Sequence, residues 1–88
     1  MALLTHIIKE GKCEGTAYDF VKAGDKLPMH DHTPETLHIT IVCDKAIIAR
    51  GEGWEITLEP GEIRRWKAYQ PHEFEAIHDK TRVVNIRV

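Results

Sequence analysis

The sequence has few cysteines, few aromatic residues and no long apolar run. Its two cysteines, Cys13 and Cys43, form neither a disulfide framework nor a C-x-x-C motif. No apolar run approaches the length of a membrane span, and Ala2-Leu3-Leu4 is far too short for the apolar core of a signal peptide. We therefore expect a protein of the reducing cytoplasm, in which Cys43, at the end of an apolar segment, is a small buried hydrophobe.

The chain also lacks an excess of charge of either sign. Its 12 lysine and arginine residues are interspersed with 14 aspartate and glutamate residues, which gives a net charge of −2. The arginines that come in pairs, Arg64-Arg65 and Arg82 with Arg87, are too few for a basic stripe and are interpreted as solvated strand faces. This pattern argues against a nucleic-acid partner, and the lack of an apolar span argues against a membrane partner.

The 88 residues are enough for one small domain, which we expect to cover residues 1–88. A domain of this size buries only about 60–65% of the surface that its unfolded chain exposes. A bound metal or a partner subunit would therefore add usefully to its stability.

What the sequence does contain is a series of short β-type segments. No segment has a helical period over about ten residues. Turns rich in glycine, proline and aspartate, among them residues 10–12 and 14–15, separate apolar or alternating segments at near-regular spacing. The predicted strands are residues 3–8, 16–21, 27–32, 36–43, 46–49, 54–58, 63–67, 74–77 and 82–88. Such a pattern predicts an all-β sandwich or barrel.

Four of the six histidines lie in two short segments of the chain. His30, His32 and His38 fall within nine residues, and His72 lies in a second strand-like segment. Residues i and i+2 of a strand share a face, so His30 and His32 would project side by side if that segment is extended. Neutral imidazole is the commonest metal ligand. A lone H-x-H is weak evidence, but His38 and His72 favour a metal site over the alternative of hydrogen-bonded strand histidines.

The spacing of these residues resembles the two sequence motifs of the cupins. Gly24, followed by five residues and then His30-Asp31-His32, resembles the first motif, G(x)5HxH(x)3–4E(x)6G. Gly61 and His72, eleven residues apart, resemble the second motif, G(x)5PxG(x)2H(x)3N. The resemblance covers about residues 18–88. It implies a small cupin-type jelly-roll barrel with a metal inside, and frequently a dimer.

The chain departs from the cupin motifs at several positions. Only two residues separate Glu35 from His32, too few for the glutamate of the first motif, and alignment on the apolar strand that follows places His38 at that position. The other departures affect turn and terminal positions. They are Lys45 near the glycine that closes the first motif, and Lys67, Tyr69 and Ala76 at the proline, glycine and asparagine of the second motif.

The resemblance implies a set of site residues. His30, His32 and His72 carry over as metal ligands, and His38 carries over by position as the fourth. Glu35 is the alternative to His38 as a ligand and a candidate catalytic base. The ion would be one divalent transition metal, Fe, Mn, Ni, Cu or Zn. Aromatic residues that could line the cavity, with core packing as their alternative role, are Tyr18, Phe20, Trp66, Tyr69 and Phe74.

Four neutral imidazoles would leave the +2 charge of the ion uncompensated and so would favour an anionic ligand. The first hypothesis is therefore a metal-dependent enzyme, dioxygenase-like or isomerase-like, that acts on a small polar or anionic molecule. The alternative is a non-catalytic cupin module that binds a small molecule or a metal. A closed structural zinc site is a third possibility. On family grounds and because of the small core, we expect a homodimer.

Overall fold

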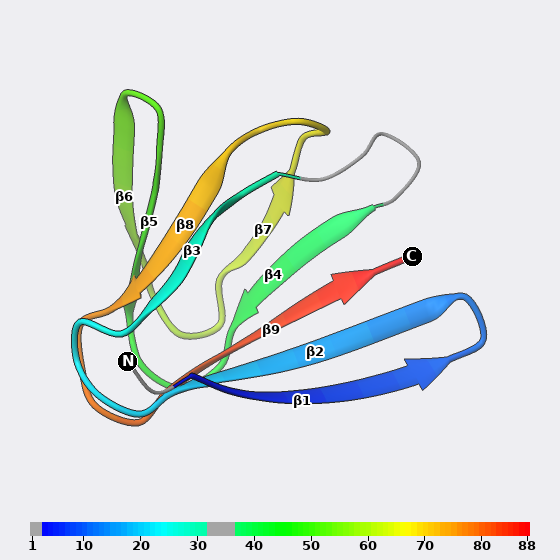
Figure 1. The fold of residues 1–88 in the computed structure, drawn as a ribbon, viewed down its shortest axis with the longest axis horizontal. Coiled ribbons are helices and arrows are strands. Elements are labelled where there is room, and N and C mark those ends of the chain that lie inside the picture. Colours follow the sequence, from blue (N-terminus) through cyan, green and yellow to red (C-terminus); the bar gives the residue numbers. More distant parts are fainter. Residues whose placement is uncertain (1–2, 32–36) are drawn as a thin grey trace.

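The computed structural model describes residues 3–31 and 37–88, which form nine strands in two antiparallel sheets (Figure 1). These residues contain no helix, and thus none that is long and apolar enough to cross a membrane. The prediction of an all-β sandwich is confirmed. In sheet order, the five-stranded sheet comprises β1 (Leu3–Glu10), β2 (Cys13–Phe20), β9 (Thr81–Arg87), β4 (His38–Val42) and β7 (Ile63–Trp66). The four-stranded sheet comprises β3 (Lys26–His30), β8 (His72–Ala76), β5 (Ile47–Gly51) and β6 (Trp54–Leu58).

After the β1–β2 hairpin the chain passes repeatedly from one sheet to the other. β3, β5, β6 and β8 lie in the small sheet, whereas β4, β7 and β9 lie in the large one. In Figure 1 the strands of the two sheets converge toward the lower left and spread apart toward the upper right. This back-and-forth path is that of a jelly roll, and it brings β3 and β8 opposite β2, β4 and β9.

The first hairpin is longer than the sequence predicts. β1 and β2 pair over eight residues each, from Leu3 opposite Phe20 to Glu10 opposite Cys13. The turn is at Gly11, which has a φ of 59°. The second predicted turn, at Glu14-Gly15, is wrong because Gly15 pairs on both sides, with Ile8 and with Ile86. A glycine inside a ladder resembles a turn when its two pairing partners are not known.

The core lies between the facing surfaces of the two sheets. Alternation places Thr40 and Val42 of β4 on the inner face, where both are about 1% exposed, and Ile39 and Ile41 on the outer face. The expectation that Cys43 is buried is wrong, since the strand ends one residue before it and its side chain is exposed. The buried apolar residues of the core are Phe20, Val42, Ile47, Ala49, Leu58, Trp66, Phe74, Ala76 and Val83.

Tyr69 occupies the turn between β7 and β8 in a backbone conformation that favours glycine. Its φ is 57°, in the left-handed region, and its side chain is 62% exposed. This is the position at which the second cupin motif has its glycine. Gln70 N–H donates to the Lys67 carbonyl oxygen at 3.2 Å, and Lys67 N–H donates to Gln70 Oε1 at 3.0 Å. The turn thus keeps its shape although a tyrosine replaces the glycine.

We expect the substitution Tyr69→Gly to raise the free energy of unfolding by about 0.5–1 kcal/mol. The left-handed conformation costs a non-glycine residue about 1–2 kcal/mol, and the greater entropy of glycine in the unfolded chain offsets part of the gain. Urea denaturation of the two proteins measures the difference. Lys67→Gly is the matched control, because Lys67 has no positive φ and its replacement should destabilise the fold. A Tyr69→Gly protein less stable than the native chain would contradict the expectation.

Candidate metal and ligand site

His30 and His72 lie directly opposite each other on β3 and β8. Leu27 pairs with Phe74 and His30 pairs with His72, so three steps along β3 match two steps along β8. The extra residue makes a β-bulge at Pro28-Met29, and β3 tolerates the proline because it is an edge strand. The bulge allows both Leu27, which packs against the core, and His30 to face inward.

His72 is enclosed by aromatic rings. Its side chain is fully buried, and its ring stacks on Trp66 with 4.2 Å between centroids and 8° between planes. The ring of His30 is 4.3 Å away in an edge-on orientation, and Phe74 is 5.7 Å away. Burial lowers the pKa of His72 to about 4, and His30 and His38 add to the effect. The imidazole of His72 is therefore neutral at physiological pH, which is the form that binds metals.

Backbone carbonyl groups fix the tautomers of both imidazoles. The Nδ1 of His72 is 2.8 Å from the Gln70 carbonyl oxygen, and the Nδ1 of His30 is 2.8 Å from the Pro28 carbonyl oxygen. Because a carbonyl oxygen can only accept, each Nδ1 carries the proton when the ring is neutral, and the lone pair is on Nε2. Protein histidines that bind metals are commonly oriented by such a hydrogen bond. The donor chemistry of the pair fits a metal site.

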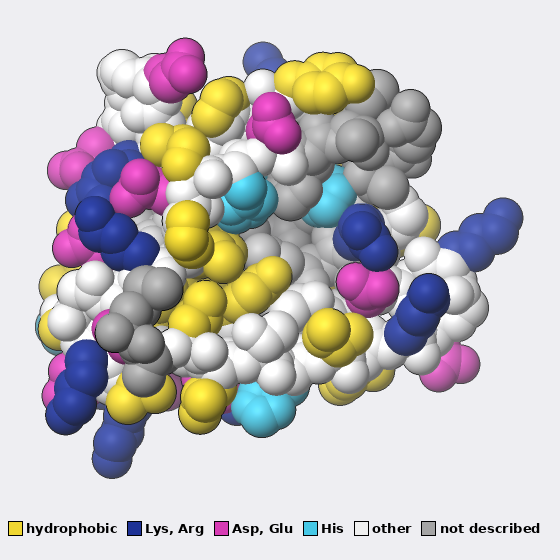
Figure 2. Space-filling model, in the orientation of Figure 1, with side chains coloured by type: hydrophobic (Ala, Val, Ile, Leu, Met, Phe, Trp, Pro, Cys, Tyr) yellow, Lys and Arg dark blue, Asp and Glu magenta, His cyan; other side chains and the backbone are white. Residues whose placement is uncertain are grey.

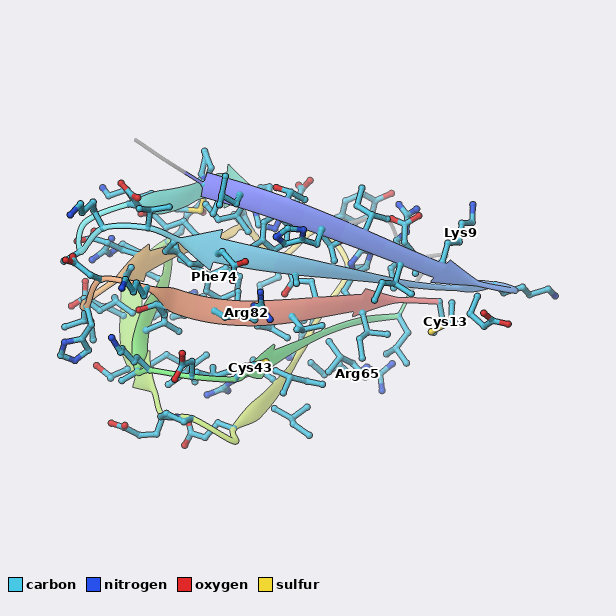
Figure 3. The ribbon with its side chains drawn as sticks, turned by 90° about the horizontal axis from the view of Figure 1, so that it is seen from below. Lys9, Cys13, Cys43, Arg65, Phe74 and Arg82 are labelled. Atoms are coloured by element: carbon cyan, nitrogen blue, oxygen red, sulfur yellow. The ribbon has the colours of Figure 1, made fainter. Side chains whose placement is uncertain are left out.

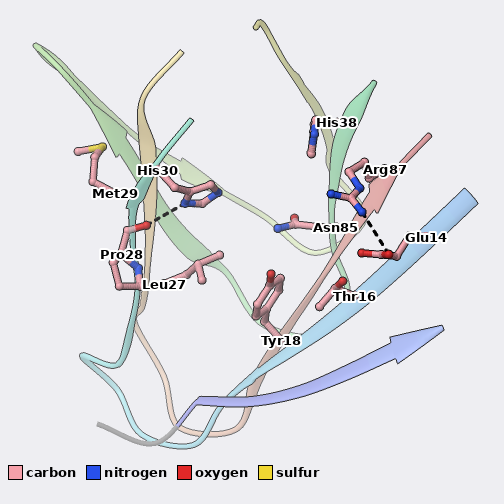
Figure 4. A pocket seen from close by; sticks show the side chains of 10 residues that line it. All are labelled: Glu14, Thr16, Tyr18, Leu27, Pro28, Met29, His30, His38, Asn85 and Arg87. Carbon is pink, nitrogen blue, oxygen red and sulfur yellow. Dashed lines mark hydrogen bonds and ion pairs between the residues drawn. The ribbon is translucent and has the colours of Figure 1, made fainter. Parts of the chain in front are cut away.

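His38 reaches the same interior from the opposite sheet. It begins β4, pairs with Trp66 on one side and Arg87 on the other, and lines with His30 a pocket of about 350 Å³ (Figure 4). Figure 2 shows histidine side chains beside the hollow in this face of the molecule. Burial lowers the pKa of His38, and the positive charges of Arg87 and His30 add to the effect. The site thus draws its imidazoles from both sheets.

The predicted ligand His32 and its alternative partner Glu35 lie outside the described residues. Within residues 3–31 and 37–88, no three side chains of histidine, cysteine, aspartate or glutamate are grouped closely enough to hold a metal ion. The structure therefore brings His30 and His72 together and places His38 across the pocket. The ligand set of His30, His32, His38 and His72 remains a prediction.

The five aromatic residues considered for the cavity have different positions. Tyr18 lines the pocket, whereas Phe20 and Phe74 are fully buried in the core. Trp66 packs on His72 and does not line this pocket, and Tyr69 is exposed. For Phe20 and Phe74 core packing, the alternative role, is the correct one.

Sequence reasoning missed the polar residues of the pocket wall. Glu14 and Thr16 of β2 and Asn85 and Arg87 of β9 all line it. Arg87 was expected on a solvated face with Arg82, but the two lie on opposite faces of β9. Alternation places Asn85 and Arg87 on the same face as Val83, but only the structure shows that Val83 is buried.

The free energy of unfolding of the metal-free protein should fall as the pH is lowered from about 6.5 to about 4. The pKa of His72 is about 4 in the folded chain and about 6.5 in the unfolded chain, so the unfolded chain binds one more proton in this window. The resulting slope is at most about 1.4 kcal/mol per pH unit, and this group contributes no further loss below the folded pKa. Urea denaturation at several pH values measures it. The pH dependence of the free energy of unfolding should be lost in His72→Gln and kept in the exposed control His78→Gln. If His72→Gln keeps it, another group causes the pH dependence.

Solved structures resemble this chain closely in fold and weakly in sequence. KdgF from Halomonas sp. superposes with a TM-score of 0.84 at 19% identity, over 97% of this chain and 78% of that one. An RmlC-like cupin protein from Desulfovibrio desulfuricans gives 0.80 at 24% identity, over 96% and 80%. The Cupin_2 domain of an XRE family transcriptional regulator from Enterobacter cloacae gives 0.82 at 13% identity, over 99% and 96%. No protein-family model matches the sequence, and no curated protein matches it. By its architecture the chain has the fold of the cupin superfamily.

Proposed function

We propose that this chain is a metal-binding cupin that acts on a small polar or anionic molecule in the pocket between its sheets. The observation that carries the proposal is the pair His30 and His72, with ring centroids 4.3 Å apart and both Nε2 lone pairs set by backbone carbonyl groups. A divalent transition metal held by His30, His32, His38 and His72 would supply Lewis-acid polarisation of a ligand oxygen. The volume of about 350 Å³ suits a small molecule.

Other residues of the chain would hold the ligand histidines in place and line the pocket of such a site. Trp66 and Phe74 enclose His72, exclude water from its inner side and hold the ring in one orientation. Leu27 and Met29 give the pocket an apolar side, and the β2–β9 wall gives it a polar side. We favour dioxygenase-like or isomerase-like chemistry, since both reactions need a small ligand oriented beside the metal.

The second candidate is a module that binds a small molecule or metal without turnover. Among the described residues that line the pocket, Glu14 is the sole carboxylate, and it accepts a hydrogen bond from Arg87 at 3.2 Å. This carboxylate is thus engaged with a guanidinium of the chain itself, an arrangement that suits the positioning of Arg87 more than proton transfer to or from a ligand. This observation favours binding without catalysis unless Glu35 supplies the base.

Elemental analysis of the purified protein tests metal binding directly. We expect about one transition metal per chain in the native protein and its loss in His72→Ala and His30→Ala, since each removes one nitrogen ligand. His30→Ala is included because His72 is fully buried and its truncation also weakens packing. The control His78→Ala should retain the metal. If the native chain stays metal-free after reconstitution with Fe(II), Mn(II) and Zn(II), the proposed function fails.

We also propose that the chain is a homodimer whose subunits meet at the outer face of the five-stranded sheet. Ile39 pairs with Ile86 and Ile41 with Val84, so these four side chains form a contiguous apolar centre. Around them lie Leu4, Ile8 and Ile63, which are 54%, 74% and 66% exposed. Figure 3 shows β1, β2, β9 and β4 side by side, with the strands running across the view. An apolar face of this extent is typical of an interaction surface.

A second copy of the chain fits this face better than a charged partner does. Arg82 and Asp19 form a two-point ion pair at 2.6 and 2.8 Å, so these two charges on the face already satisfy each other. An apolar centre can meet itself across a two-fold axis without repulsion. Five strands with about 4.8 Å spacing and about 3.3 Å per residue give a face of roughly 500 Å² in projection. A standard interface buries about 800 Å² of accessible surface per partner, so a dimer would use nearly the whole of this face.

Sedimentation at micromolar concentration should therefore show a dimer for the native chain and a monomer for Ile63→Glu. The new carboxylate would have to be buried without a partner at the interface. Ile77→Glu is the control, since Ile77 is an exposed isoleucine outside the five-stranded sheet. A native monomer, or a dimer that survives Ile63→Glu, would contradict this interface.

We further propose a cytoplasmic location. Cys13 and Cys43 are both exposed free thiols, and a reducing compartment maintains such thiols.

A further inference from the structure

The pocket has a polar wall on the five-stranded sheet, opposite His30. In Figure 4 the side chains of β2 and β9 rise from this wall toward the space beside His30 and His38. Thr16 pairs with Asn85 and Glu14 with Arg87, so these four residues form two cross-strand rows. The metal hypothesis does not use this wall, and its chemistry can be examined separately.

A buried chain of hydrogen bonds fixes the orientation of Asn85. Trp66 Nε1–H donates to Thr40 Oγ1 at 2.8 Å, and the Thr40 hydroxyl donates to Asn85 Oδ1 at 2.5 Å. Thr40 is only 1% exposed and has a single hydroxyl proton, so the indole donor directs that proton to the amide oxygen. The NH₂ group of Asn85 therefore faces the pocket as a donor (Figure 4).

Arg87 presents a cation at the open end of the same wall. One Nη donates to Glu14 Oε2 at 3.2 Å, and half of the arginine side chain is exposed. A guanidinium has five N–H donors, and the contact with Glu14 uses one of them. Glu14 thus positions the group while leaving donors that a ligand carboxylate can engage in a two-point contact.

Thr16, opposite Asn85, and Tyr18, opposite Val83, add hydroxyl groups to the same wall. Burial and the charge of Glu14 raise the pKa of Tyr18, so its phenol keeps its proton and can donate. The wall therefore presents a guanidinium, an amide NH₂ and hydroxyl donors to one small space. Its chemical complement is an oxygen-rich anion.

Resting on the proposed function, we propose that the ligand is a small hydroxycarboxylic acid, with its carboxylate on Arg87 and its neighbouring oxygens on Asn85 and Tyr18. This placement directs the other end of the ligand across the pocket toward His30, because β3 faces the β2–β9 wall. Arg87 and Asn85 are then the residues that determine specificity. A neutral analogue of the same shape would leave the guanidinium without a matching charge.

The experiment compares malate with its uncharged diamide, by isothermal titration of the protein as purified and of the metal-free protein. We expect millimolar or tighter binding of malate, and about tenfold weaker binding of the diamide, because the diamide loses a charge-assisted contact. Arg87→Gln and Asn85→Asp should each weaken malate binding about tenfold in both preparations. Arg82→Gln is the matched control, since Arg82 lies on the opposite face of the same strand and also pairs with a carboxylate.

The metal content of each sample, measured in parallel, separates this inference from the proposed function. Metal retention with malate binding that is indifferent to Arg87→Gln and Asn85→Asp overturns the inference alone. Equal binding of malate and the diamide by the native chain, or no binding of malate, also overturns it and needs no folded variant. If malate binding depends on Arg87 in a protein that takes up no metal, the result would support the proposed ligand contacts of the β2–β9 wall and refute the metal site.

Discussion

The pairing of His30 with His72 is the constraint on which the candidate site depends. A strand places alternate residues on one face, so a register shift of one residue would turn His30 away from the interior. The bulge at Pro28-Met29 shifts the register after Leu27 by one residue, so that His30 also faces inward. The edge position of β3 allows the proline, which cannot donate a backbone hydrogen bond. With His72 fixed between Trp66 and His30, the position of one imidazole determines that of the other.

The two sheets supply complementary chemistry to one pocket. β3 brings the imidazole of His30, with His72 of β8 packed against it, and these nitrogens suit a cation. β2 and β9 bring hydrogen-bond donors that suit an anion. Trp66 links the two sides, because its ring contacts His72 and its N–H begins the chain that orients Asn85. A change at this one core residue would therefore affect both walls.

The local sequence pattern predicted much of this fold, and the rest depends on which strands pair and in which register. The alternating segments and turns were sufficient for the β-sandwich, and the motif spacing was sufficient to single out His30 and His72. The bulge was not predictable, because it is defined only by a partner strand. Gly15 was mistaken for a turn for the same reason. On β4 and β9 both faces carry apolar residues, so alternation alone could not tell that Asn85 and Arg87 face inward.

The stacking of Trp66 on His72 also has an optical consequence. Both tryptophans of the chain belong to one aromatic stack, since Trp54 lies 6.0 Å from Trp66 with nearly parallel rings. The emission of this stack comes from a ring in contact with a candidate ligand. An ion with an unfilled d shell on His72 would quench that emission, whereas zinc, with its filled d shell, would leave it bright. The intrinsic fluorescence of the protein would thus distinguish the kinds of metal that these histidines are proposed to bind.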